Sequence, residues 1–238
     1  MKIALIGYGK MGKAIEEIAL NRGHEIVLKI DEHNLPDFTK ENISKAEVAI
    51  EFTGPHSAYE NVKKALSFDI PLVCGSTGWL DKLDEIKKIC AGGKGSFIYS
   101  SNFSVGVNIF FEVNKKLAEL MAAHSDYEPQ VTEIHHTSKK DAPSGTAITI
   151  AEQLLEKIRR KKSWVNHITE NADELEILSE RTDPAPGTHK VKFASAIDDI
   201  EIIHTAHSRQ GFALGAVLAA EFIKNKKGCF GLKDVLGL

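Results

Sequence analysis

The chain has 238 residues, of which 42% are hydrophobic and 26% are charged, a mixture typical of a globular protein with one large or two small domains. Its 30 basic and 33 acidic residues give a net charge of −3, which argues against binding of nucleic acid through bulk positive charge. No apolar run reaches the roughly 18 residues of a membrane helix, and the apolar run at the start is too short for a signal peptide, so we expect a cytoplasmic protein without a membrane partner.

The three cysteines are Cys74, Cys90 and Cys229. They are far apart in the sequence and form no C-x-x-C pair, which fits a reducing cytoplasm better than a disulfide framework or a zinc site. We therefore expect all three to be small buried hydrophobic residues, and we predict no metal site.

The first half of the chain alternates strand and helix patterns. Short apolar runs predict five strands, at residues 2–6, 25–30, 47–53, 71–74 and 96–99. Helical patterns lie between them, at residues 11–22, 57–67 and 81–90. This alternation predicts a Rossmann-like, doubly wound α/β domain, in which helices cover both faces of a parallel sheet.

The pattern changes after residue 103. Predicted helices at 105–123 and 144–160 and strands at 130–136, 188–197 and 200–205 follow, then a last helix at 211–224 and a Gly- and Lys-rich tail. Residues 161–187 hold two prolines and many acids and are expected to be irregular. We predict an inserted α+β domain with an antiparallel or mixed sheet.

These predictions divide the chain into a dinucleotide-binding domain, residues 1–103 with 210–238, and a substrate-binding and catalytic domain, residues 104–209. A hinge between them is expected to close on the ligands.

Gly7, Gly9 and Gly12 form a G-x-G-x-x-G motif that follows a strand and opens a helix. In a dinucleotide site the first glycine permits a tight turn, the second lets the backbone approach a pyrophosphate, and the third lets the helix pack on the strand. The helix N-terminus then offers unpaired N–H groups to the phosphates. The alternative is an ordinary strand–helix turn.

Asp31 ends the second predicted strand, 19 residues after Gly12. An acid about 20 residues after the motif bonds the ribose hydroxyls of the adenosine, and its charge repels a 2′-phosphate, so NADH is favoured over NADPH. Lys10, Lys29 and His33 are close enough in sequence to weaken that preference. The alternative is an ordinary surface aspartate.

Two further loops follow the fourth and fifth predicted strands. They are Gly75-Ser76-Thr77-Gly78 and Ser100-Ser101-Asn102-Phe103. Ligands of open α/β sheets bind at the carboxyl ends of the strands, so these loops are placed to touch the nicotinamide and its ribose. Ordinary Gly/Ser turns are the alternative.

The segment 133–147, EIHHTSKKDAPSGTA, gathers proton-transfer groups beside a predicted helix start. Histidines titrate near neutral pH, and a lysine near a second cation can donate a proton. The backbone N–H groups at Pro143-Ser144-Gly145-Thr146 would hold a carboxylate. Structural histidines, solvated lysines and a simple helix cap are the alternatives.

The same segment closely resembles the signature of the dihydrodipicolinate reductase family, E-x-H-H-x-x-K-x-D-A-P-S-G-T-A. Four further blocks resemble family segments and occur in family order: GYGKMG, GSTGW, SSNFSVGVN and HSRQGFALGA. The resemblance therefore spans nearly the whole chain.

The resemblance implies a generally homotetrameric, NADH- or NADPH-dependent reductase of lysine and diaminopimelate biosynthesis. Its small-molecule substrate is the cyclic imine dicarboxylate derived from 4-hydroxy-tetrahydrodipicolinate, and its product is tetrahydrodipicolinate. By matched position, His135 is the acid/base histidine, Lys139 the proton donor and His136 a substrate contact, and Gly145 and Thr146 hold a substrate carboxylate. The implied cofactor contacts are Gly7, Tyr8, Gly9, Lys10, Met11, Gly12, Asp31, Gly75, Ser76, Thr77, Ser100, Ser101, Asn102 and Phe103.

The chain departs from the family pattern after Asp31, where Glu32 and His33 replace a frequent arginine, which weakens the case for NADPH. Arg209, in the HSR motif, is a further candidate to support the dicarboxylate, or else forms a salt bridge. Two other functions stay open: a dehydrogenase of another imino acid, and a non-catalytic protein that binds NADH as a redox signal.

Overall fold

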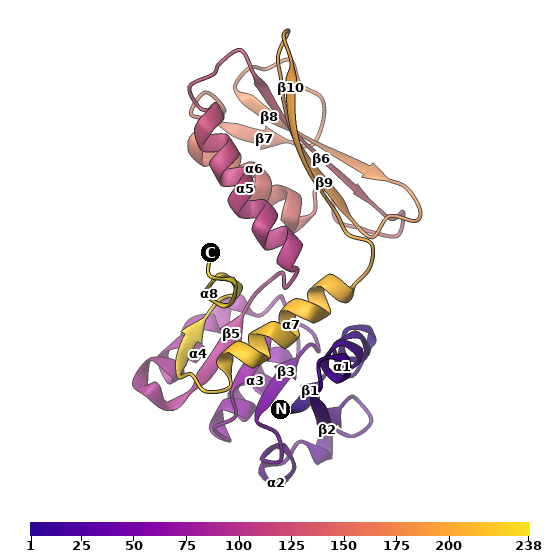
Figure 1. Ribbon diagram of the computed structural model, residues 1–238, viewed down its shortest axis with the longest axis vertical. Coiled ribbons are helices and arrows are strands. Elements are labelled where there is room, and N and C mark those ends of the chain that lie inside the picture. The colour runs from indigo at the N-terminus through magenta and orange to yellow at the C-terminus, as the bar shows by residue number, and fades with distance from the viewer. The chain divides into compact units, whose positions relative to one another are not determined.

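The computed structural model describes residues 1–238, with only the backbone described at residues 92 and 94. The chain forms two compact units (Figure 1). Unit 1 contains residues 1–108 and 209–238, and unit 2 contains residues 109–208. Within the described residues, no helix has the length and apolar character needed to cross a membrane.

Unit 1 is built on a six-stranded parallel sheet with the order β11-β5-β4-β3-β1-β2. Its strands are β1 (Lys2–Ile6), β2 (Glu25–Ile30), β3 (Val48–Glu51), β4 (Leu72–Cys74), β5 (Ser96–Tyr99) and β11 (Gly228–Phe230). Its helices are α1 (Lys10–Asn21), α2 (Lys40–Ile43), α3 (Ala58–Ser67), α4 (Leu83–Ile89), α7 (Gln210–Ile223) and α8 (Leu232–Leu236). Short turns lie at η1 (Leu35–Asp37), η2 (Leu80–Lys82) and η3 (Cys90–Lys94).

Both faces of this sheet are buried, because successive side chains of a strand point to opposite faces. Ile3 and Leu5 of β1 join a core with residues of α1 and α7. Ala4 and Ile6 of the same strand join a second core with residues of α3. Strands buried on both faces must be apolar throughout, which is why they appear in the sequence as short continuous apolar runs. The predicted doubly wound α/β fold is confirmed.

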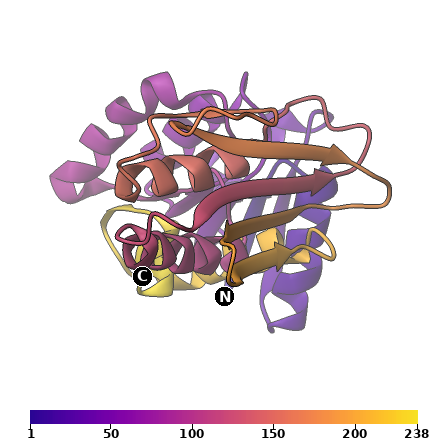
Figure 2. The same ribbon diagram turned by 90° about the horizontal axis from the view of Figure 1, so that it is seen from above.

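Unit 2 packs two helices against a mixed five-stranded sheet with the order β10-β9-β6-β8-β7. The strands are β6 (Glu128–His135), β7 (Ser163–Val165), β8 (Glu174–Arg181), β9 (Thr188–Ala194) and β10 (Asp199–Thr205). The helices are α5 (Val105–Met121) and α6 (Gly145–Lys157). The core lies between one sheet face and the two helices, whose ribbons Figure 2 shows from above. The predicted α+β character of this part is confirmed.

The expectation that residues 161–187 are irregular is wrong, because β7 and β8 lie in this segment. β8 pairs in parallel with β6, next to the centre of the sheet. Its buried Leu175 and Ile177 alternate with glutamates that point to the other face. Those acids and the nearby prolines hid the period-two pattern of a strand that is buried on one face only.

Two features of the C-terminal region also differ from expectation. The tail after α7 forms β11 and α8, which extend the core of unit 1 through Leu232. Cys74 and Cys90 are buried as expected, but Cys229 is exposed. Cys229 lies on the three-residue edge strand β11, which is too short and too peripheral to be covered on both sides.

Helix α7 lies close to the backbone that follows β5 at Gly215. A Cβ atom at this position would lie 1.8 Å from the carbonyl oxygen of Phe103, whereas one at Gly211 in the same helix would lie 3.6 Å from Ser104 Oγ. Gly215 therefore allows the helix to pack directly on the chain that leaves the sheet.

We expect Gly215→Ala to destabilise the chain by about 1–3 kcal/mol, the cost typical of overpacking, because the new methyl group overlaps the Phe103 carbonyl. Gly211→Ala is the matched control, and it should be neutral or stabilise by up to about 1 kcal/mol through helix propensity. Urea unfolding of both variants measures the difference. Equal midpoints would contradict the close contact.

Candidate active site

The glycine motif of unit 1 has the three geometries that its spacing predicts. Gly7 has φ +98°, and a Cβ there would lie 2.3 Å from the carbonyl oxygen of Phe52. A Cβ at Gly12 would lie 2.3 Å from the Gly7 carbonyl oxygen, so only glycine lets α1 pack this close to β1. At Gly9, by contrast, no described heavy atom lies within 4 Å of a Cβ, so the backbone faces open space.

Helix α1 begins at Lys10 directly after this open position. Gly9 is its N-cap, and within the described part of the chain no side chain caps it and no acid occupies its first turn. The first N–H groups of a helix have no partner within the helix, and the helix dipole makes this end positive. The Gly9 backbone and the start of α1 therefore fit a pyrophosphate.

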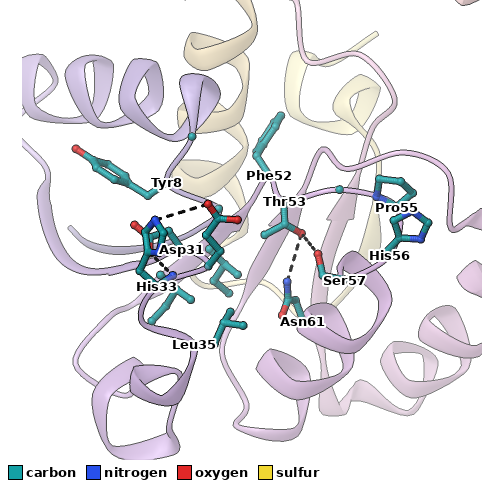
Figure 3. Close-up of a pocket in the computed structure, with 16 residues that line it drawn as sticks. Tyr8, Asp31, His33, Leu35, Phe52, Thr53, Pro55, His56, Ser57 and Asn61 are labelled. Atoms are coloured by element: carbon teal, nitrogen blue, oxygen red, sulfur yellow. Dashed lines mark hydrogen bonds and ion pairs between the residues drawn. The ribbon is translucent and has the colours of Figure 1, made fainter.

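A pocket of about 580 Å³ lies beside this loop, at the carboxyl ends of β1, β2 and β3 (Figure 3). Of the predicted cofactor residues, Gly7, Tyr8, Gly9 and Asp31 line it. Asp31 is half-buried, and its carboxylate accepts the backbone N–H of His33 at 2.8 Å. The carboxylate is thus held at the pocket wall, where a ribose would meet it.

The charges near Asp31 leave the pocket negative on this side. Glu32 adds a second carboxylate to the lining. The Lys29 ammonium lies 2.6 Å from Glu16 and 4.7 Å from the centre of the Tyr8 ring, so its charge is already paired. From the sequence, Lys29 was a candidate to offset the charge of Asp31, but in the structure it pairs with Glu16.

Sequence reasoning missed the β3–α3 loop, which forms the opposite wall of the pocket. Its lining residues are Phe52, Thr53, Gly54, Pro55, His56, Ser57 and, from α3, Asn61. Fully buried Glu51 organises this loop, because it accepts the Thr53 N–H at 2.9 Å and the Cys74 thiol at 3.0 Å. The sequence does contain a pattern that could have indicated this wall: Glu51 is followed by Phe-Thr-Gly-Pro at the end of a parallel strand, where ligands bind.

The other two predicted cofactor loops follow β4 and β5 but do not line this pocket. Gly75 is required by packing, because a Cβ there would lie 2.1 Å from the Phe52 ring. Phe103 is buried, and its ring lies 5.7 Å from the same ring, tilted by 57°. The Ser76 hydroxyl is buried without a partner among the described residues. The cofactor contacts of Gly75–Thr77 and Ser100–Phe103, and of Lys10, Met11 and Gly12, stay predictions.

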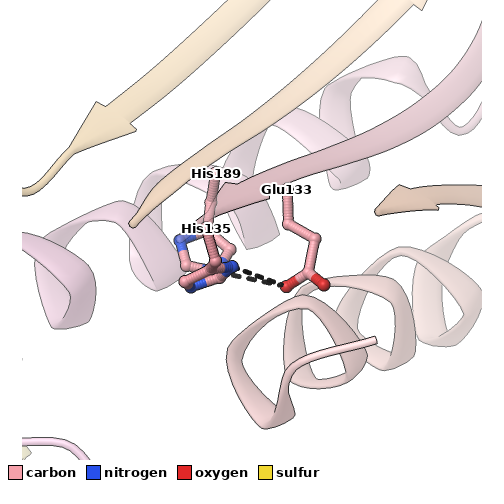
Figure 4. Close-up of side chains that lie close together, drawn as sticks. All are labelled: Glu133, His135 and His189. Atoms are coloured by element: carbon pink, nitrogen blue, oxygen red, sulfur yellow. Dashed lines mark ion pairs between the residues drawn. The ribbon is translucent and has the colours of Figure 1, made fainter. Parts of the chain in front are cut away.

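In unit 2 a second polar centre is buried between the sheet and α6 (Figure 4). Glu133 and His135 lie two residues apart on β6, so they share one face, and His189 pairs with Glu133 across to β9. His135 Nδ1 lies 3.3 Å and His189 Nε2 4.0 Å from Glu133 Oε2. The two imidazole rings meet edge to face at 5.2 Å.

The Glu133 carboxylate is fully buried but well satisfied. It accepts the Ser144 N–H at 3.1 Å with each oxygen, the Ser179 hydroxyl at 2.8 Å and the Arg181 guanidinium at 3.2 Å. Burial alone would raise the pKa of Glu133, but the interactions with His135, Ser144 and Ser179 outweigh it and hold the pKa well below its ordinary value of 4.5. Glu133 is therefore a carboxylate at neutral pH.

His189 is neutral under the same conditions. Burial lowers its pKa to about 4, and the charge of nearby His135 acts in the same direction, against the opposing effect of Glu133. Its Nε2 lies 3.3 Å from the Ser144 hydroxyl.

The loop after β6 carries the predicted proton donor. The Lys139 ammonium lies 2.8 Å from both carboxylate oxygens of Asp141, and this bond lowers the pKa of Asp141. His136 is half-buried, with its Nδ1 2.7 Å from the Ser138 hydroxyl. Lys139 also contributes to the low pKa of His189, so the lysine lies within electrostatic reach of the buried centre.

Helix α6 begins at the predicted anion site. Ser144 is its N-cap and accepts the Ala147 N–H at 3.2 Å, and within the described chain the first turn holds no acid. No described heavy atom lies within 4 Å of a Cβ at Gly145. Packing therefore does not require a glycine here, whereas approach of a ligand to the Gly145-Thr146 backbone would. Arg209 is exposed at the N-cap of α7 in unit 1.

We expect the low pKa of His189 to make folding stability depend on pH. In the unfolded chain this histidine takes up a proton near pH 6.5, whereas in the folded chain it does so only near pH 4. The free energy of unfolding is therefore highest above pH 6.5 and decreases as the pH falls from 6.5 to 4. The loss should be roughly 2 kcal/mol between pH 7 and pH 5. Denaturant unfolding at both pH values measures it, and His189→Gln should remove this part of the dependence. An unchanged dependence in the variant would contradict the assignment.

Comparison with known proteins assigns both parts of the chain to one family. Residues 1–103 match the family model "Dihydrodipicolinate reductase, N-terminus", and residues 106–236 match "Dihydrodipicolinate reductase, C-terminus". A 4-hydroxy-tetrahydrodipicolinate reductase of Christiangramia forsetii is 50% identical over 99% of this chain and 98% of that protein. A protein of the same name from Methanoregula boonei is 36% identical over 100% of this chain and 98% of its own length.

A solved structure has the same fold. The dipicolinate-bound dihydrodipicolinate reductase of Paenisporosarcina sp. TG-14 superposes with a TM-score of 0.77 at 23% identity, over 97% of each chain. The two family models together cover nearly all of the sequence, and the relatives match it from end to end. The chain belongs to the dihydrodipicolinate reductase family.

Proposed function

We propose that this chain uses NADH or NADPH to reduce the cyclic imine dicarboxylate derived from 4-hydroxy-tetrahydrodipicolinate, giving tetrahydrodipicolinate for lysine and diaminopimelate biosynthesis. One observation carries the proposal beyond family membership. The segment 133–147 places His135, Lys139 and the open start of α6 within one unit, so that proton donors adjoin an anion site. A dicarboxylate that must be protonated needs both.

The two units would divide the work. Unit 1 would bind the dinucleotide, with its pyrophosphate at Gly9 and the start of α1 and its adenosine ribose at Asp31. When bound, the cofactor supplies a hydride, and reduction of an imine also consumes a proton. Unit 2 would bind the substrate and supply that proton, which agrees with the predicted roles of residues 104–209.

We assign proton transfer to His135 and Lys139. His135 is mostly buried at the end of β6, and its Nδ1 lies 3.3 Å from the ionised Glu133 carboxylate. The Lys139 ammonium pairs with the Asp141 carboxylate, and a substrate carboxylate would offer it a second anionic partner. Gly145, Thr146 and His136 would hold the substrate carboxylate at the start of α6.

We expect His135→Ala and Lys139→Ala each to lower kcat about 10²- to 10⁴-fold, the usual contribution of general acid–base catalysis. Lys140→Ala is the matched control, since Lys140 is the exposed neighbour of Lys139, and it should keep near-normal activity. The assay follows NADH oxidation with enzymatically generated substrate. Full activity in both alanine variants would refute these residue roles.

We further propose that the chain prefers NADH. Asp31 and Glu32 line the pocket where a 2′-phosphate would have to sit, and Lys29 is already paired with Glu16. The negative charges of Asp31 and Glu32 would repel the negative charge of a bound 2′-phosphate.

The dissociation constant for NADH should accordingly be lower than that for NADPH, and Asp31→Asn should narrow the gap by weakening the repulsion of the 2′-phosphate. Fluorescence titration of both cofactors against both proteins measures it. Tighter binding of NADPH by the unaltered chain would refute the preference.

A homotetramer and a cytoplasmic location are proposed from the family resemblance. The sheet of unit 2 supports assembly, because α5 and α6 cover one face only, and the other face carries Ile203, 57% exposed on the edge strand β10. Light scattering coupled to size-exclusion chromatography tests the proposed homotetramer, and a monomer would refute it.

A further inference from the structure

We propose that Glu133 is a positioning residue, which holds the proton of neutral His135 on Nδ1 and fixes this ring relative to the start of α6. The inference rests on the proposed function and deepens it. It assigns a role to a buried acid that the proton transfer itself does not use.

The first step is that Glu133 is immobile and charged. Its carboxylate is fully buried and bonded from three elements: the start of α6 through Ser144, and β8 through Ser179 and Arg181, in addition to its own strand β6. A buried carboxylate with this many donors stays ionised, and moving it would leave several of them unpaired. Glu133 is therefore a fixed negative point within the sheet.

The second step concerns the two nitrogens of His135. Nδ1 lies 3.3 Å from Glu133 Oε2, which is an ion-pair distance, and it makes no hydrogen bond of regular geometry to any described residue. A carboxylate can only accept, so neutral His135 is favoured with its proton on Nδ1. Nε2 then carries the free lone pair and is the atom that takes up or delivers a proton.

The third step is the space beside Nε2. Gly187, just before β9, has φ +153°, and a Cβ at this position would lie 3.1 Å from His135 Nε2. The nearest ring atom after that, Cδ2, would be 3.3 Å away. The absent side chain thus leaves room next to the nitrogen that the tautomer makes reactive.

The fourth step is the link to the anion site. Both oxygens of Glu133 accept the backbone N–H of Ser144, the N-cap that directly precedes Gly145 and Thr146. One carboxylate therefore orients the imidazole and the helix start. A substrate carboxylate bound at that helix start would then stand at a fixed offset from Nε2, as catalysis by orientation requires.

The same three side chains resemble a metal site, since donor atoms of Glu133, His135 and His189 lie within 4.8 Å of one another. The carboxylate, however, already accepts from two backbone or hydroxyl donors and from the Arg181 guanidinium. A cation at Glu133 would face that guanidinium, so the occupied oxygens favour the positioning role.

The test is Glu133→Gln, which keeps an oxygen for the Ser144 N–H but loses the charge. We expect kcat to fall about 100-fold, within the range for general acid–base catalysis, while KM changes less than about threefold. The matched control is Glu180→Gln, on the exposed side of β8, and it should match the unaltered enzyme. An unchanged kcat, or a loss expressed only in KM, would overturn the proposal.

A second measurement reads the tautomer in the unaltered chain, and a variant serves only to assign the signal. Long-range ¹H–¹⁵N spectra of the ¹⁵N-histidine-labelled, unaltered chain report which ring nitrogen carries the proton, with His135 assigned by its absence in His135→Gln. We expect Nδ1–H for neutral His135, and Nε2–H would overturn the proposal. Spectra that change on addition of Zn²⁺ at stoichiometric concentration would instead support the metal site. If the unaltered chain fails to reduce its substrate, the proposed function fails, and the tautomer can still be read.

Discussion

The second unit depends on the hydrogen bonds and ion pairs that hold the buried carboxylate of Glu133. Burying an ionised group without partners strongly destabilises the folded state, so the surrounding fold must supply hydrogen-bond donors. Here β8, the start of α6 and the neighbouring histidine all do so. The position of β8 in the sheet and the entry of α6 are thus fixed by one charge as well as by the apolar core beneath it.

The first unit is organised by a different constraint, the exclusion of side chains. Gly7 and Gly12 are required because a Cβ would collide with backbone oxygens at 2.3 Å, whereas Gly9 is surrounded by open space. Two of the glycines therefore build the turn, and the third leaves the backbone accessible to a phosphate. Both units leave a helix start open for an anion, and in unit 2 the buried Glu133 and His135 lie next to that helix start.

The fold of unit 1 was predictable because its strands are buried on both faces and its glycine motif is local. The start of α6 and the pairing of Glu133 with His135 on one strand face were also within reach, since alternation in a strand is a local property. What the sequence concealed was β8. Its outward glutamates and the prolines nearby suggested an irregular segment, so Ser179 and Arg181 could not be placed beside Glu133. His189 and Gly187 were missed for the related reason that their neighbours depend on strand pairing across β6 and β9.

The buried Glu133 carboxylate also explains why residues of the segment 133–147 lie close together, although the segment passes through a strand, a loop and a helix start. Two residues of strand put Glu133 and His135 on the same side, and eleven residues later the chain returns to the same carboxylate through the Ser144 N–H. The loop closed by that bond carries the Lys139–Asp141 ion pair, and the charge of Lys139 contributes to the low pKa of His189. His135, Lys139 and the start of α6 are therefore brought into one segment by local chain closure around a buried charge, which the donors from β8 stabilise. Removing those donors should disturb His135 and the start of α6 together, because both contact the Glu133 carboxylate.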